Sequence, residues 1–208
     1  AAACVYGPHP ASRRGGAPPR ARFPCWGSRA GARRAAAIAA VAQGQVSRAF
    51  DLVDSDKREV VIELVQRLAD GEEPMAVAEE FSAYVASQRA AIDAQFKSWP
   101  FSDADADLAQ EAREEIKDET AALADAQARR DILDLLYLVE TWYRDVLVYS
   151  ETRDVALVFN RDRLDALESL SGEGVAEKLA ALDKARLYLE RFITEDRVFR
   201  DLFFALAG

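Results

Sequence analysis

From residue 32 onward, large apolar residues recur every three or four positions, and this period constrains the fold more than any other feature. Such spacing is typical of amphipathic helices, whereas the alternation that marks strands is nearly absent. Glycine or proline separates successive stretches. We therefore predict an all-α fold, a helical bundle with short connections, with helices over 32–43, 48–53, 57–70, 74–98, 129–150, 161–170, 173–193 and 195–206.

Two stretches near the middle of the chain differ sharply in their apolar content. Residues 129–150 carry apolar side chains on more than one face, so we expect this helix to be buried on most sides. Residues 102–128 consist mainly of alanine and charged residues. That composition predicts either a solvated helix or a flexible connection that leads into the buried one.

The amino-terminal segment is basic and rich in proline and glycine. Residues 1–34 hold seven arginines and no acidic residue, together with five of the seven prolines and five of the ten glycines. Because proline and glycine oppose an amphipathic helix, a transit peptide is disfavoured. We expect residues 1–31 to be disordered or extraneous. The chain begins with Ala1 and its only methionine is Met75, so we also expect an upstream part.

The rest of the chain is strongly acidic. Of 27 basic residues, seven lie in 1–34, which leaves 20 basic and 36 acidic residues and a net charge of −16 for 35–208. Such a body repels phosphate backbones, so any contact with DNA is expected to run through partner proteins. No apolar run reaches the roughly 20 residues of a membrane helix. We expect a cytoplasmic protein, since nothing here needs an oxidising compartment.

Few residues could carry out chemistry. Cys4, His9 and Cys25 are the only cysteines and histidine, and their spacing fits no usual metal-ligand pattern. The body therefore lacks the residues of a Ser-His-Asp triad or a thiol nucleophile. No glycine-rich phosphate loop occurs. We predict no catalytic residue, no metal site and no cofactor held by this chain alone.

Three short motifs follow one another in a recognisable order. Gly44 ends one alanine-rich helix, and Arg48-Ala49 lies at the start of the next. About a hundred residues later comes Trp142-Tyr143-Arg144-Asp145, and two closing helices follow. This order resembles the AAA+ clamp-loader family, in particular the delta-prime subunits of bacterial DNA polymerase III. Val46-Ser47 stands where the family usually has Pro-Gly.

The resemblance implies a domain organisation and a function. Residues 32–55 would be the last helices of an AAA+ lid domain, and 56–208 the helical collar (oligomerisation) domain. The chain would be a structural subunit that assembles with clamp-loader ATPase subunits and the clamp-opening subunit to load the sliding clamp in DNA replication. It would be a subunit of the DNA polymerase III holoenzyme without a catalytic site of its own.

The resemblance also implies roles for individual residues. Arg48 would be a sensor-2-like residue that contacts nucleotide phosphates, a task suited to a guanidinium at a helix amino terminus. The alternative is a solvent-exposed arginine. Trp142, Arg144, Phe199 and Phe203 are candidates for a subunit interface, since aromatic residues and arginine concentrate there. For Trp142 and Arg144 the alternative role is structural.

Two other classes of protein stay open. One is a helical dimerising scaffold or the ligand-binding domain of a regulator, which would need a DNA-binding helix-turn-helix that residues 1–34 do not suggest. The other is a small-molecule enzyme of helical fold, which the absence of histidine and cysteine from the body disfavours.

Overall fold

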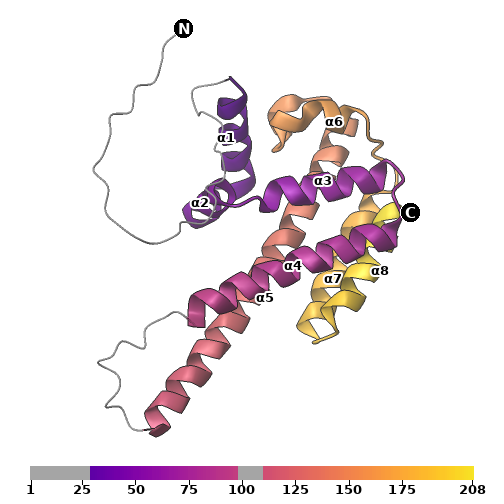
Figure 1. Ribbon diagram of the computed structural model, residues 1–208. Helices are drawn as coiled ribbons and strands as arrows, with labels where there is room; N and C mark the ends of the chain where they lie inside the picture. Colours follow the sequence, from indigo (N-terminus) through magenta and orange to yellow (C-terminus); the bar gives the residue numbers. More distant parts are fainter. Residues whose placement is uncertain (1–28, 98–109) are drawn as a thin grey trace, which may run out of the picture.

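The computed structural model describes residues 29–97 and 110–208, and these residues form helices joined by short connections (Figure 1). No strand occurs within the described ranges, so the predicted all-α fold class is confirmed. The elements are α1 (Arg29–Ala42), α2 (Val46–Asp54), α3 (Lys57–Ala69), α4 (Pro74–Lys97), α5 (Gln110–Thr152), η2 (Val155–Leu157), η3 (Arg161–Arg163), α6 (Leu164–Glu168), α7 (Val175–Glu190) and α8 (Glu195–Ala207).

Helix α5 is 43 residues long, and α3, α4 and α7 all pack against it. It joins the predicted buried helix 129–150 to residues 110–128 without a break. No glycine or proline lies between Gln110 and Thr152, and the alanine-rich residues 110–128 have a high helix propensity. Of the two structures predicted for 102–128, the described part therefore adopts the helix.

The other long helices surround the carboxyl-terminal half of α5. Helix α4 crosses α5, α7 packs against α5, and α8 packs against both α4 and α7 (Figure 1). One main core results, because each helix turns its apolar stripe inward, and a smaller cluster of Ile92, Ala124 and Ala128 joins α4 to α5 beside it. Its most deeply buried large side chains are Leu64, Phe81, Leu135, Leu136, Trp142, Leu182, Phe199, Phe203 and Leu206.

Three aromatic rings form the contact between α4 and α8. The Phe81 and Phe199 ring centroids lie 4.9 Å apart with an interplanar angle of 86°, and the Phe81 and Phe203 centroids lie 5.2 Å apart. Edge-to-face pairs of this kind add about 0.5–1.5 kcal/mol to the stabilisation from burial. The apolar stripe of α8 therefore packs within this chain and stabilises the bundle.

Helices α1 and α2 form a separate pair at one end of the bundle (Figure 1). Helix α1 packs against α2 and against η3, a segment more than a hundred residues away in the chain. Ala37, Ile38 and Val41 make the buried side of α1. The pair thus rests on the bundle through α1, while much of α2 faces outward.

The segment after α5 differs from its prediction. Residues 161–170 do not form one helix; the chain makes η3 and then the five-residue α6. Asn160 immediately precedes η3, and its side chain caps no helix there. Its side chain makes other hydrogen bonds, described below, which explains the difference. Helix α2 begins at Val46, two residues before the predicted start at residue 48, and Gln45 precedes it.

Residues 1–28 lie outside the described part, and with them Cys4, His9, Cys25 and most of the predicted segment 1–31. Among the described helices, none combines the length and the apolar character that crossing a bilayer requires. The division into a lid-like part, 32–55, and a collar, 56–208, stays a prediction.

We predict that Phe203→Ala lowers the free energy of unfolding by about 3–5 kcal/mol, because it leaves a cavity against Phe81. Urea titration followed by far-ultraviolet circular dichroism measures this change. Phe204→Ala is the matched control: the neighbouring ring is 51% exposed, so we expect a change below about 1 kcal/mol. Equal effects of the two substitutions would contradict this description of the α4–α8 contact.

Candidate functional site

Arg48 lies in the first turn of α2, as the sequence predicted, and its side chain points at the bundle. Its Nη2 is 3.0 Å from Oδ1 of Asp134 in α5, and its guanidinium lies 4.2 Å from the centroid of the Tyr137 ring. The side chain is only 21% exposed. In this arrangement Asp134 and the Tyr137 ring contact the Arg48 guanidinium, while its Nε is buried without a hydrogen-bond partner. A contact of Arg48 with nucleotide stays a prediction.

Tyr137 strengthens the same joint from α5. Its hydroxyl donates a hydrogen bond of 2.8 Å to the backbone carbonyl of Val41 in the last turn of α1. Burial raises the pKa of Tyr137, which keeps this hydroxyl protonated as the donor. One side chain of α5 thus contacts both α1 and Arg48 of α2.

Lys57, at the start of α3, adds a third link between these helices. Its amine lies 3.0 Å from a carboxylate oxygen of Asp51 in α2 and 3.2 Å from one of Asp131 in α5. Burial opposes the charged amine, but the hydrogen bond to Asp51 and the charge of Asp131 outweigh it and raise the pKa of Lys57. The α1–α2 pair is consequently fixed to α3 and α5 largely by charged and polar contacts.

Three of the four predicted interface residues are core residues of this chain. Trp142 is 1%, Phe199 1% and Phe203 0% exposed. A partner protein would meet these side chains only if the bundle opened. Of the four predicted residues, Arg144 alone reaches the surface, and the interface role stays a prediction.

Arg144 closes over the segment that follows α5. Its Nη1 donates to Oδ1 of Asp145 at 2.7 Å and to the Leu157 carbonyl at 2.8 Å, and its guanidinium lies 3.9 Å from the Phe159 ring centroid. The side chain is 35% exposed. Within this chain Arg144 holds η2 and the residues after it against α5.

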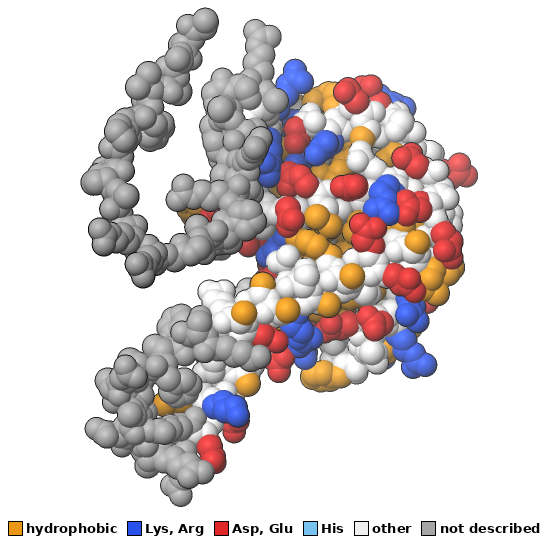
Figure 2. Space-filling view, viewed as in Figure 1, with side chains coloured by type: hydrophobic (Ala, Val, Ile, Leu, Met, Phe, Trp, Pro, Cys, Tyr) orange, Lys and Arg blue, Asp and Glu red, His pale blue; other side chains and the backbone are white. Residues whose placement is uncertain are grey.

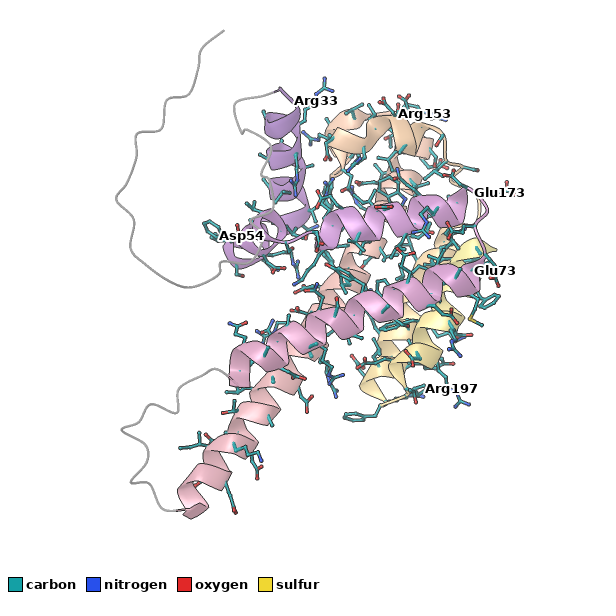
Figure 3. The ribbon with its side chains drawn as sticks, viewed as in Figure 1. Arg33, Asp54, Glu73, Arg153, Glu173 and Arg197 are labelled. Atoms are coloured by element: carbon teal, nitrogen blue, oxygen red, sulfur yellow. The ribbon has the colours of Figure 1, made fainter. Side chains whose placement is uncertain are left out.

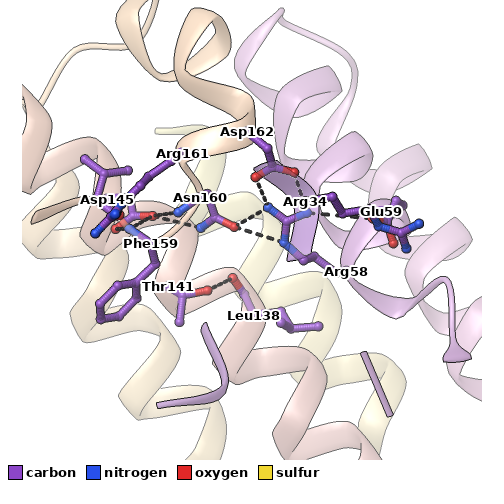
Figure 4. Close-up of polar contacts among 11 residues, drawn as sticks. Arg34, Arg58, Glu59, Leu138, Thr141, Asp145, Phe159, Asn160, Arg161 and Asp162 are labelled. Atoms are coloured by element: carbon purple, nitrogen blue, oxygen red, sulfur yellow. Dashed lines mark hydrogen bonds and ion pairs between the residues drawn. The ribbon is translucent and has the colours of Figure 1, made fainter. Parts of the chain in front are cut away.

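Asp145 is the centre of a buried polar network (Figure 4). Its side chain is fully buried and accepts hydrogen bonds from the backbone N–H groups of Phe159 and Asn160, at 3.0 and 2.7 Å. It also accepts one of 2.9 Å from the side-chain amide of Asn160. These bonds supply partners to backbone groups that the irregular segment would otherwise bury without any.

Arg58 of α3 completes the network from the other side. Its Nε and Nη2 donate to Oδ1 of Asn160 at 3.1 and 2.8 Å, and its two terminal nitrogens donate to Asp162 at 2.6 and 3.0 Å. Arg58 is 1% exposed. Glu59, beside it, pairs with Arg34 of α1 at 3.0 Å, so the network extends to the α1–α2 pair (Figure 4).

The formal charges of this network balance, and Asp145, Asn160, Arg58 and Asp162 use one another as partners, whereas Nε of Arg34 and Oε2 of Glu59 are buried without a hydrogen bond. Arg144 and Arg58 face Asp145 and Asp162, which offsets much of the desolvation cost. The arrangement positions helices and shows no side chain poised for acid–base or nucleophilic chemistry. Within the described residues, no group of three or more metal-ligating side chains is placed to hold a metal ion.

Sequence reasoning missed Arg58 and the use made of Asn160. A signal for Arg58 existed: it lies three, four and seven residues before Val61, Ile62 and Val65, on the apolar stripe of α3. A charged residue on such a stripe is buried with a partner. Nothing in the local sequence identifies that partner, Asn160, which lies more than a hundred residues away.

Comparison of the chain with protein-family models, with curated proteins and with solved structures gives no match.

We predict that Asp145→Ala lowers the free energy of unfolding by about 3–5 kcal/mol, because it removes the acceptor of the buried N–H groups of Phe159 and Asn160 and the ion-pair partner of Arg144. Urea unfolding measures the loss. Asp118→Ala, an exposed aspartate of the same helix, is the control and should change stability by less than about 0.5 kcal/mol. A mild effect of Asp145→Ala would show that the network contributes little.

A second prediction concerns alkaline pH. Burial raises the pKa of Tyr143 in the folded chain, so its contribution to stability is complete below the unfolded pKa of about 10 and is lost as pH rises above it. As pH rises from 9 to 11, the free energy of unfolding of the Tyr143→Phe variant should therefore fall by about 1 kcal/mol less than that of the unsubstituted chain. Urea midpoints at each pH test this, and identical losses would contradict it.

Proposed function

We propose that this chain is a structural subunit of a clamp loader, resembling delta-prime, that assembles with ATPase subunits and a clamp-opening subunit to load the sliding clamp. The observation that carries the proposal is a short helix pair fixed to the end of a helical bundle. The pair corresponds to the residues assigned by resemblance to the end of a lid domain. The bundle corresponds to the collar.

The links between α1–α2 and the bundle support this role. Arg48, Tyr137, Lys57 and Arg34 each connect the pair to α3 or α5 through an ion pair or hydrogen bond. Under the proposal, these links fix the orientation of α2, and of a protein unit bound to it, relative to the bundle. We propose that Arg48 acts mainly as a positioning residue of this joint, and that a nucleotide would reach it only by displacing Asp134.

Two exposed apolar residues on α2 support a contact between this helix and another protein unit. Val46 is 67% and Phe50 65% exposed, and they lie four residues apart on one face. Exposed apolar pairs of this kind mark surfaces that meet another protein unit. Under the proposal, this face meets the ATPase-like module that the resemblance places upstream.

The distribution of charge supports an indirect relation to DNA. Acidic and basic side chains are interspersed over the face of the bundle shown in Figure 2, and residues 35–208 carry a net charge of −16. A continuous basic stripe is the usual footprint of a DNA-binding surface. We propose that partner subunits provide the contact with DNA.

The test is reconstitution of the full chain with clamp-loader ATPase subunits and the clamp-opening subunit, followed by size-exclusion chromatography with light scattering. We expect a defined hetero-oligomer, and no ATP hydrolysis by the chain alone. A stable homodimer that ignores these subunits would support the dimerising regulator in its place. Tight binding of MgATP by the isolated chain, abolished by Arg48→Ala, would contradict the positioning role of Arg48.

A further inference from the structure

The turn between α7 and α8 places an aromatic residue in an unfavourable conformation. The N–H of Ile193 donates to the Tyr188 carbonyl at 3.1 Å, and the N–H of Phe192 donates to the Leu189 carbonyl at 3.1 Å. These two bonds define a Schellman motif, in which the residue at the position of Phe192 takes a positive φ. The φ of Phe192 is +58°.

Phenylalanine is a poor choice for this position in the isolated chain. Glycine normally occupies it, because a side chain in the left-handed region costs about 1–2 kcal/mol. The Phe192 ring is also 78% exposed, more than any other large apolar side chain among the described residues. Gln43 and Arg153 also have a positive φ, but Phe192 is the one of the three that combines it with an exposed aromatic ring.

The ring borders a groove. A hollow of about 380 Å³ lies between α5, which contributes Arg129, Ile132 and Leu133, and the α7–α8 turn. Leu133 and Ile193 are 39% and 36% exposed along it. The Arg129 guanidinium lies 4.7 Å from the Phe192 ring centroid and braces the ring. The turn is at the free end of the hairpin, away from α1 and α2 (Figure 1).

Acidic groups border the same groove. Glu195 and Asp196, in the first turn of α8, line it, and Arg129 is the only basic residue among the lining side chains. Arg129 already faces the ring, and Glu195 lies 3.2 Å from Arg89. Arg197 points away from the bundle at this end (Figure 3). Because Glu195 is paired with Arg89, Asp196 is the lining carboxylate without an ion pair among the described residues, and it adds a negative charge beside the apolar side chains of the groove.

We propose that this groove, the Phe192 groove, binds a segment of another protein that presents a large apolar side chain next to lysine or arginine. The apolar side chain would pack against Phe192, Leu133 and Ile193. The cation would face Asp196 at the start of α8, where charge complementarity favours it. This inference goes beyond the proposed function and holds whichever assembly the chain joins.

The probe is the acetylated and amidated peptide Lys-Phe-Leu-Lys-Lys, titrated into the ¹⁵N-labelled full chain. We expect saturable shifts of the amide signals of Leu133, Ile193 and Asp196. The peptides Glu-Phe-Leu-Glu-Glu and Lys-Ala-Ala-Lys-Lys should bind at least about tenfold more weakly, because each lacks one of the two required features.

Phe192→Gly separates binding from folding. Glycine tolerates the positive φ, so the melting temperature should stay the same or rise, while peptide affinity falls about tenfold with the loss of the aromatic ring. Phe204→Ala removes an exposed ring of α8 that does not line the groove, and should leave affinity unchanged. A second variant, Asp196→Asn, should weaken binding of the basic peptide only.

Four results would overturn the inference. They are the absence of saturable shifts, equal affinity for the acidic peptide, a marked fall in melting temperature for Phe192→Gly, and a concentration-dependent homodimer abolished by Phe192→Gly. The third would make Phe192 a structural residue. The fourth, read by analytical ultracentrifugation, would make the occupant a second copy of this chain.

Discussion

The buried carboxylate of Asp145 is the interaction on which the rest of the structure depends. It holds the backbone of Phe159 and Asn160, so the chain after α5 turns back against the bundle. Asn160 then presents its carbonyl oxygen to Arg58, which fixes α3. Helix α1 rests on η3, in the same segment. A buried network of this kind stabilises only when every member has its partner, because a lone buried charge costs several kcal/mol.

A second set of contacts attaches the α1–α2 pair to α5, and the apolar residues Ile38, Val41 and Leu52 of that pair belong to the main core. Arg48, Tyr137 and Lys57 attach α1–α2 to α5 through contacts between charged or polar groups, with a small apolar patch beneath. Polar joints fix orientation more sharply than apolar packing, since hydrogen bonds are directional. Arg48, which the resemblance relates to nucleotide binding, is paired with Asp134 of α5 in the described arrangement.

Aromatic residues in this chain belong to two populations with different consequences. Phe199 and Phe203 lie in the core and hold α8 to α4, whereas Phe192 projects from a turn whose backbone favours glycine. Residue type alone does not separate them, because aromatic side chains are enriched in cores and at interfaces alike. The two groups differ in exposed fraction and in backbone φ, because Phe192 lies in the α7–α8 turn whereas Phe199 and Phe203 lie within α8.

The sequence by itself determined the helical fold class, most helix ends and the acidic body, because period, glycine placement and charge are local properties. It also located Arg48 at the start of α2. Only the tertiary structure decided that Arg48 pairs with Asp134, 86 residues away, and that Arg58 pairs with Asn160, 102 residues away. Such partners are chosen by how the helices pack, and no pattern within one helix encodes a neighbour that distant.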